Sequence, residues 1–411
     1  MSASIKRVAR VGLFAGITLA SVVSAPAHAG GFEVPMQGAR AAGQADAFVA
    51  QADDPSAIHY NPAGLTQLKG TNFSIGATGF FPDWNFDADT GPSQSMHLPS
   101  VLPHIYAESD FGLDRWRFGI GVNTPFGLSE DWGGSGPLRF FSDEAQLAVL
   151  NLQPTIAYKL TDDLSVGLGV NFYFGQLLMT RSVILGPPPT PEGDFHFRGS
   201  AWSYGVTPSV MWKIDDRNTV GAFSRSPFSL DFGGDASVKI AGTTAVGPSR
   251  SHLSVDFPQM AGIGYAFRPV RPLKLEADVT WTDWNTLDSA VLRSGNPAFN
   301  GSTIPADWKS GFTYRVGVQY DLTKEWTARA GYAYGSNAIP SSTFSPLVPD
   351  SNYHLFAVGL GYHAPKWSLD AAYQLIYRES RQINDSIVSP ALHGTWDNTI
   401  HTAMVTLTFQ L

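Results

Sequence analysis

Cysteine is absent from the 411-residue sequence, so no disulfide can stabilise the fold. Charged residues are also scarce: they make up 15% of the chain, whereas about a quarter is typical of soluble proteins. Beyond residue 29, no apolar run reaches the roughly 18 residues that suggest a transmembrane helix. The formal net charge of −8 argues against nucleic acid as a partner. These absences disfavour both an ordinary soluble protein and a helical membrane protein.

The start of the chain has the pattern of a secretory signal peptide. A basic beginning is followed by the apolar stretch VGLFAGITLASVVSA, and AHA at 27–29 fits a cleavage site after Ala29. An uncleaved membrane anchor is the alternative, but the flanking residues suit cleavage better. We therefore expect residues 1–29 to be a signal peptide and the exported chain to begin at Gly30.

A two-residue periodicity recurs along most of the remaining chain. In WSLDAAYQLIYR (367–378), every second residue from Trp367 to Tyr377 is apolar or aromatic, and the opposite face carries Asp370 and Arg378. A soluble half-buried sheet alternates too, but many such strands indicate a barrel with one face toward lipid. The predicted strands are 71–82, 100–110, 115–124, 146–159, 164–178, 201–213, 219–228, 252–267, 272–284, 310–321, 326–335, 353–363, 367–378 and 400–410.

The predicted connections alternate in length. Every second one is a tight turn such as LTDD or APK, whereas the others are long and rich in Gly, Pro, Ser and Asp. This asymmetry is typical of outer-membrane barrels, whose short turns face the periplasm. The sequence therefore predicts an all-β, 14-stranded antiparallel transmembrane β-barrel over 71–411, with both termini periplasmic. One girdle of aromatic residues is expected beside the short turns: Trp116, Trp212, Phe267, Tyr320, Trp326, Tyr362 and Trp367.

Residues 30–70 do not alternate and carry helix-start signals instead. QGARAAGQADAFVAQ (37–51) is consistent with a short helix. In ADDPSAIHYNPAGLTQL (52–68), Asp54 and Asn61 can each cap a helix that the following proline opens. The stretch could also be a surface turn or part of a loose tail. Because apolar residues lie between the caps, we predict a partly helical hatch that plugs the barrel lumen.

This segment closely resembles the N-terminal hatch of the FadL/TodX family of outer-membrane transporters for hydrophobic compounds. DDPSAIHYNPAG (53–64) carries the most specific part of the resemblance. It continues through GVNTPFGLSEDW (121–132), DVTWTDWNTLD (278–288) and PLVPDSNYHLFAVGLGY (346–362). The resemblance implies passive transport: a substrate caught between extracellular loops passes to a pocket near the hatch. It then leaves sideways into the membrane beside an inward kink in the third strand.

The resemblance also singles out residues. In the family, the hatch motif lies against the third-strand kink, and the chain start lies near the inner pocket. Glycine in a strand often marks a bend, which suggests candidates for the kink. The matching residues are Asn61, Pro62 and Ala63 for the hatch motif; Gly30 and Phe32 for the chain start; and Gly119, Gly121 and Asn123 for the kink.

Two further sets of residues are candidates for substrate contact. The apolar loop pieces SVILGPPP (182–189) and SPFSLDF (226–232) could line the outer groove, although loop packing explains them equally well. Inward-facing cations could receive a fatty carboxylate, but such groups more often pair with acids. The candidates are Val183, Ile184, Leu185, Phe228, Leu230 and Phe232 for the groove, and Arg117, Lys274, Arg315 and Arg329 for the carboxylate.

No catalytic motif competes with transport. Neither Gly-x-Ser-x-Gly nor His-Glu-x-x-His occurs, so we expect no enzyme activity, metal or cofactor. A water-filled porin, a lipase-like barrel and an adhesin are the alternatives, and a plugged lumen argues against the porin. The expected substrate is a fatty acid or an aromatic hydrocarbon. Outer-membrane lipid, lipopolysaccharide and the barrel assembly machinery are the expected partners of a monomer.

Overall fold

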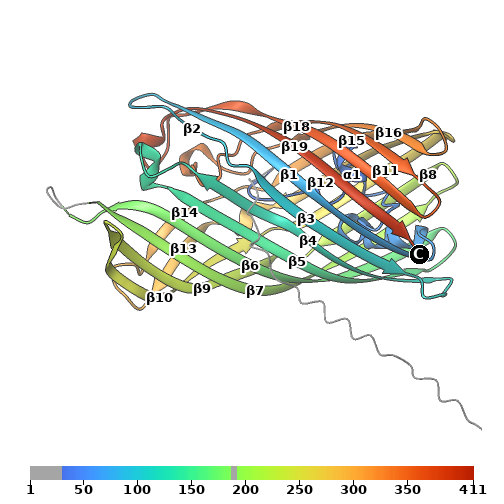
Figure 1. Cartoon of the computed structure of the whole chain (residues 1–411), viewed down its shortest axis with the longest axis horizontal. Coiled ribbons are helices and arrows are strands. Elements are labelled where there is room, and N and C mark those ends of the chain that lie inside the picture. The colour runs from blue at the N-terminus through green and yellow to red at the C-terminus, as the bar shows by residue number, and fades with distance from the viewer. Residues whose placement is uncertain (1–29, 187–191) are drawn as a thin grey trace, which may run out of the picture.

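The computed structural model describes residues 30–186 and 192–411, so the predicted signal peptide lies outside the described residues. Long antiparallel strands form a closed wall around residues 30–70, the hatch (Figure 1). The strands are β1 (Thr71–Ala88), β2 (Gln94–Met96), β3 (Ser100–Ser109), β4 (Trp116–Asp131), β5 (Glu144–Lys159), β6 (Leu164–Ile184), β7 (Glu192–Lys213), β8 (Asn218–Arg225), β9 (Phe228–Ile240), β10 (Thr243–Phe257), β11 (Gln259–Val270), β12 (Leu273–Asp283), β13 (Ser289–Ser294), β14 (Ser302–Pro305), β15 (Gly311–Asp321), β16 (Trp326–Gly335), β17 (Tyr353–His363), β18 (Trp367–Ile383) and β19 (Gly394–Gln410).

Pairing between the first and last strands closes the sheet. β1 pairs with β19 on one side and with β3 on the other. Three wall strands are interrupted, so that β8 with β9, β10 with β11, and β12 with β13 each occupy one position in the wall. The short strands β2 and β14 only extend the pairing at one end. The described residues therefore form the predicted 14-stranded antiparallel barrel.

Prolines mark two of the three interruptions. Pro227 separates β8 from β9, and Pro258 separates β10 from β11. Proline has no N–H to donate to a ladder, so it ends regular pairing at these points. Beyond them, β9 and β10 form a hairpin over residues 228–257. The long loop predicted between residues 228 and 252 is therefore wrong, and most of it is strand.

The faces of the wall follow the predicted alternation. On β18, Trp367, Tyr373 and Tyr377 are exposed on the outside, whereas Asp370 and Gln374 are buried inside. Among the described residues, no helix has the length and apolarity to cross a membrane. Of the predicted girdle, Trp116, Trp212, Tyr320, Trp326 and Trp367 are exposed beside the short turns, and Phe267 and Tyr362 are half-buried there.

The hatch consists of short helical turns inside the wall: α1 (Ala39–Ala42), α2 (Ala57–Tyr60) and η1 (Pro62–Gln67). The helix expected over 37–51 is thus only one turn long. The Asn61 side chain accepts the N–H of Ala63 at 3.1 Å, which confirms the predicted cap before Pro62. Three more 3-10 turns lie at the long-loop end and a fourth follows β12: η2 (Pro137–Phe140), η4 (Ser341–Thr343), η5 (Pro390–Leu392) and η3 (Trp284–Thr286).

Two inward carboxylates on β12 hold the hatch against the wall. Asp278 accepts the backbone N–H groups of Phe48 at 2.7 Å and Val49 at 3.0 Å. Glu276 accepts the next two N–H groups along the hatch, at 2.6 and 3.0 Å. Four buried donors that have no helical partner are satisfied in this way. Close approach also needs glycine in the wall, since a Cβ at Gly331 would lie 2.2 Å from the carbonyl carbon of Gln44.

Candidate functional site

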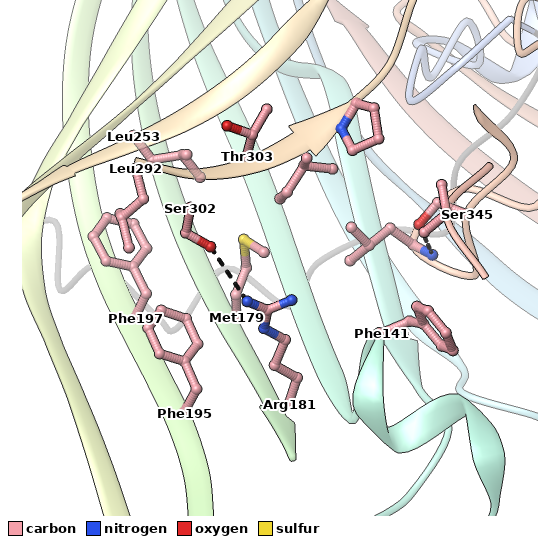
Figure 2. Close-up of a pocket in the computed structure, with 14 residues that line it drawn as sticks. Phe141, Met179, Arg181, Phe195, Phe197, Leu253, Leu292, Ser302, Thr303 and Ser345 are labelled. Atoms are coloured by element: carbon pink, nitrogen blue, oxygen red, sulfur yellow. Dashed lines mark hydrogen bonds between the residues drawn. The ribbon is translucent and has the colours of Figure 1, made fainter. Parts of the chain in front are cut away.

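An outer pocket of about 80 Å³ lies at the long-loop end of the barrel. Figure 2 shows side chains from β6, β7, β10, β13 and β14 converging on it. Arg181 is its only basic residue: it donates to Ser302 Oγ at 3.3 Å and lies 5.6 Å from the centre of the Phe195 ring (Figure 2). Within the described residues, no carboxylate oxygen comes within 4.0 Å of this guanidinium. The outer pocket is therefore apolar with one uncompensated cation.

A second space, the inner cavity, continues from the outer pocket toward the hatch. Its volume is about 100 Å³, and it shares Met179, Leu253 and Ile304 with the outer pocket. Its lining is aliphatic and aromatic apart from two hydroxyl residues, Thr343 and Ser345. The two spaces therefore make one continuous apolar path through the upper lumen.

Phe32 closes the deep end of the inner cavity. Its ring lies 4.9 Å from Trp284, 5.3 Å from Trp308 and 5.4 Å from Phe257, measured between ring centroids. The preceding Gly31 has a φ of +73°, and a Cβ there would lie 2.4 Å from Trp308. Only glycine fits both the conformation and the space. Gly31 thus allows the chain to turn so that Phe32 enters the aromatic seat formed by Phe257, Trp284 and Trp308.

The N-terminal segment (residues 30–34) pairs with β4 through its backbone. The N–H of Val34 donates to Pro125 O at 2.8 Å, and the N–H of Gly127 donates to Phe32 O at 2.9 Å. Pairing of β4 with β3 ends at Val122, where it faces Ile105. Beyond that point β3 pairs only with β1. The N-terminal segment therefore takes the place of β3 along this part of β4.

The same part of β4 has left the lipid-facing wall. Alternation stops at Asn123, and all residues from 123 to 130 are buried. The register with β5 also shifts between Asn123 and Phe126. Gly119 and Gly121 lie before this shift, in the regular part of the strand, and a Cβ at either would lie within 2.9 Å of Ile58. Of the three kink candidates, Asn123 is at the departure, and the glycines make room for the hatch.

The hatch motif contacts β6 and β7. Asn61 Nδ2 donates to Val210 O on β7 at 3.2 Å, and the N–H of Ala63 donates to Ser209 Oγ at 2.9 Å. Pro62 packs against Gly167 on β6. The expectation that this motif also lies against the third-strand kink stays a prediction. Ile58 and His59 of α2, just before the motif, contact that strand.

The groove candidates fall into two groups. Phe228, Leu230 and Phe232 are buried residues of β9, so their prediction as a loop piece is wrong. Their two-residue spacing follows the strand and points all three inward. Val183 and Ile184 end β6, and Leu185 follows it; Ile184 and Leu185 are exposed. The rest of the loop piece, from residue 187, lies outside the described residues.

Three of the four carboxylate candidates already have acidic partners. Arg329 lies 2.7 Å from Asp370, and Arg117 lies 2.7 Å from Asp110. Lys274 contacts Asp53 of the hatch. Arg315 differs, because its guanidinium donates to Thr280 Oγ1 at 2.9 Å and no carboxylate of the described chain lies within 4.0 Å.

Sequence reasoning missed Arg181 and Phe126. The predicted strand 164–178 stops before Arg181, whereas β6 continues to Ile184. Extending the alternation by three residues places Arg181 on the lumen face, so the signal was present. Phe126 is harder to find, because its stretch loses the alternation that identifies strands. In the part of the chain that the structure describes, no group of three His, Asp or Glu side chains could hold a metal ion.

The closed wall, the hatch and the apolar path define a plugged β-barrel with a hydrophobic interior. The chain belongs to the outer membrane protein transport protein family (OMPP1/FadL/TodX), whose model matches residues 20–411. It is 21% identical over 411 residues to the long-chain fatty acid transport protein of Shigella flexneri, covering 89% of this chain and 92% of that protein.

Two solved structures share the fold. A Pseudomonas aeruginosa FadL homologue superposes with a TM-score of 0.83 at 20% identity, covering 92% of this chain and 99% of that one. The toluene transporter TbuX of Ralstonia pickettii has a TM-score of 0.72 at 19% identity, covering 91% of this chain and 98% of that one. The protein is thus a β-barrel of a family of outer-membrane transporters.

Proposed function

We propose that this protein carries hydrophobic compounds passively through the outer membrane and releases them sideways between β3 and β4. The route runs from the outer pocket through the inner cavity to Phe32. One observation carries the proposal: the backbone pairing of the N-terminal segment with the part of β4 that has left the wall. The same segment closes the cavity and covers the free edge of β4, so its movement opens both.

The free energy that holds the N-terminal segment in place is small enough for a ligand to release it. Two backbone hydrogen bonds contribute about 1 kcal/mol each, and burial of Phe32 contributes roughly 2–3 kcal/mol. A few kcal/mol is within the range that ligand binding can shift. A substrate that fills the aromatic seat replaces the contacts of Phe32 and so offsets much of this cost. Apolar substrate then meets lipid at the gap and has no reason to return to water.

The substrate class follows from the lining and from the relatives. The inner cavity suits any apolar chain or ring, in keeping with relatives named for long-chain fatty acids and for toluene. Arg181 adds a charged donor in the outer pocket, where it can receive the carboxylate of a fatty acid during capture. We therefore favour an apolar acid as substrate and keep an aromatic hydrocarbon as the second candidate.

Orientation follows from the connections. We assign the short turns and both ends of the exported chain to the periplasmic side, and the outer pocket to the cell exterior. The protein acts here as a transporter rather than as an enzyme, without cofactor or energy source. Outer-membrane lipid receives the substrate, and we expect a monomer that the assembly machinery inserts among lipid and lipopolysaccharide.

Uptake by cells that lack the protein tests this function. Deletion should slow uptake of a long-chain fatty acid or of toluene several-fold while leaving uptake of a small sugar unchanged, and the wild-type gene should restore it. Loss of sugar uptake with normal hydrophobic uptake would support the porin alternative and contradict the proposal.

A further inference from the structure

A polar chamber of about 30 Å³ lies on the other side of the N-terminal segment from the inner cavity. Glu33, Asp46, His59, Arg225 and Arg315 line it. Phe32 lines the cavity and Glu33 lines the chamber, because neighbouring residues of an extended segment point to opposite sides. The segment therefore lies between an apolar space and one lined by charged side chains of both signs.

The two arginines of the chamber are buried without ion pairs. Arg225 is 3% exposed and Arg315 is 7% exposed. Among the described residues, no carboxylate oxygen lies within 4.0 Å of either guanidinium, although Arg329 in the same lumen lies 2.7 Å from its acid. Arg225 donates to His59 O at 3.1 Å, but its buried Nε has no hydrogen-bond partner. Buried cations normally have an acidic group in direct contact, so both guanidinium groups could still take a carboxylate at ion-pair distance.

Two acids face these arginines, and neither contacts them. Asp46 is held away by the hydroxyl of Tyr60 at 2.8 Å and the amide of Gln374 at 3.1 Å. Glu33 pairs with Phe126 through its backbone, and its carboxylate lies more than 4.0 Å from both guanidinium groups. Burial raises the pKa of Glu33 to about 7, although the charges of Arg315 and Arg225 act to lower it. Because Glu33 faces the arginines without contacting them, a free carboxylate could take its place.

We propose that Phe32 and Glu33 stand in for a substrate that is an apolar carboxylic acid, with Phe32 in place of its chain and Glu33 in place of its carboxylate. When the segment moves, the substrate carboxylate binds Arg225 and Arg315 in the chamber. An untethered carboxylate can approach a guanidinium in the two-pronged geometry that Glu33 cannot reach. This inference rests on the proposed function, because the acid arrives through the inner cavity.

Equilibrium binding to the purified barrel tests the inference. The two ligands are a long-chain fatty acid and the alcohol of the same chain length, at a pH where the acid is ionised. Glu33→Ala empties the chamber of its own carboxylate, so affinity for the fatty acid should rise about tenfold relative to affinity for the alcohol, as expected for a charge-assisted hydrogen bond. The ratio of the two affinities is the measured quantity, because any change in docking of the segment acts on both ligands equally.

Second-site variants make the test specific. Adding Arg315→Gln or Arg225→Gln to Glu33→Ala should remove the gain for the acid. Adding Arg329→Gln, whose guanidinium already pairs with Asp370, should leave the gain in place. Folding of each variant is checked by the mobility shift of heated and unheated barrel on gels.

The outcomes separate this inference from the transport proposal. A gain that is equal for acid and alcohol, or one that survives both arginine substitutions, would overturn the stand-in role while leaving transport intact. If the wild-type barrel bound neither ligand, the transport proposal itself would fail, and the inference with it.

Discussion

At the scale of single residues, the first described positions have separate tasks. Gly31 supplies the conformation that brings the chain to Trp284 and Trp308. Phe32 then closes the inner cavity, and Glu33 enters the chamber beside Arg315. Gly31, Phe32 and Glu33 each contact different groups, so substitutions at these three neighbouring positions should have different effects.

Glu33 should make opening of the segment depend on pH. Its pKa is about 7 when the segment is docked and 4.5 when it is exposed, so protons favour the docked state. Docking is strongest below pH 4.5 and weakens as pH rises through about 7, by up to about 3 kcal/mol. Uptake of a neutral hydrocarbon should therefore be several-fold slower at pH 5 than at pH 7.5.

A glutamine substitution isolates this effect from other groups in the chamber. Burial also raises the pKa of Asp46 and lowers that of His59, and Tyr60, Arg225 and Arg315 are the other ionisable groups in the lining. Glu33→Gln should give the slow, low-pH rate at both pH values. A pH dependence that persists unchanged in this variant would assign it to Asp46 or His59 instead.

Arg181 should affect acids more than hydrocarbons. In the outer pocket it has one hydrogen bond, at 3.3 Å, so a substrate carboxylate gains a nearly free donor. Arg181→Gln should lower the initial rate of fatty acid uptake at low concentration by about fivefold to tenfold, since hydrogen bonds to charged groups contribute about 1.5–3 kcal/mol. Toluene uptake should not change. Arg139→Gln, which removes an exposed pair with Glu192, is the matched control, and equal effects of both variants would refute the role.

At the scale of elements, β12 and β4 divide the hatch into fixed and releasable parts. β12 holds residues 48–51 through four hydrogen bonds to two carboxylates. β4 holds the N-terminal segment through only two backbone hydrogen bonds. The body of the hatch should therefore stay in place while residues 30–34 move.

Loss of the β12 carboxylates should loosen the hatch body. The double variant Glu276→Ala/Asp278→Ala leaves four buried N–H groups without acceptors, at about 1–3 kcal/mol each. We expect the barrel to form but to leak small polar solutes when reconstituted in liposomes. Asp283→Ala on the same strand is the control, since Asp283 bonds outside the hatch, to Asn285 and Ser310. A double variant as tight as that control would show that other contacts hold the hatch.

Elements also show how far sequence reasoning reaches. Strand number and facing follow from two-residue alternation, because burial on one side of a wall repeats along the chain. The cap at Asn61 follows from local chemistry. The departure of β4 from the wall after Val122 cannot be predicted from local sequence. It depends on pairing with Phe32 and Val34, which lie more than eighty positions away in the chain. Alternation and resemblance therefore predicted a plugged barrel, whereas the contact that closes the inner cavity could be found only in the structure.

At the scale of the whole molecule, the wall and the hatch body form one bonded framework, and residues 30–34 are the part that we expect to move. The wall closes through β1 and β19, and the hatch body is bonded to it. The apolar path ends at the segment that covers the gap in the wall. Transport should then depend on release of that segment and on nothing larger.

A reversible cross-link between the segment and β4 tests whether transport needs release of the segment. Glu33 and Phe126 face each other across an antiparallel bridge, in the arrangement whose Cα atoms are roughly 4.5 Å apart and can accept a disulfide. The chain has no cysteine of its own, so Glu33→Cys/Phe126→Cys introduces the only pair. Oxidation should lower hydrophobic uptake at least tenfold, reduction should restore it, and neither single variant should respond. Equal uptake in the oxidised and reduced states, with the disulfide formed, would contradict the account.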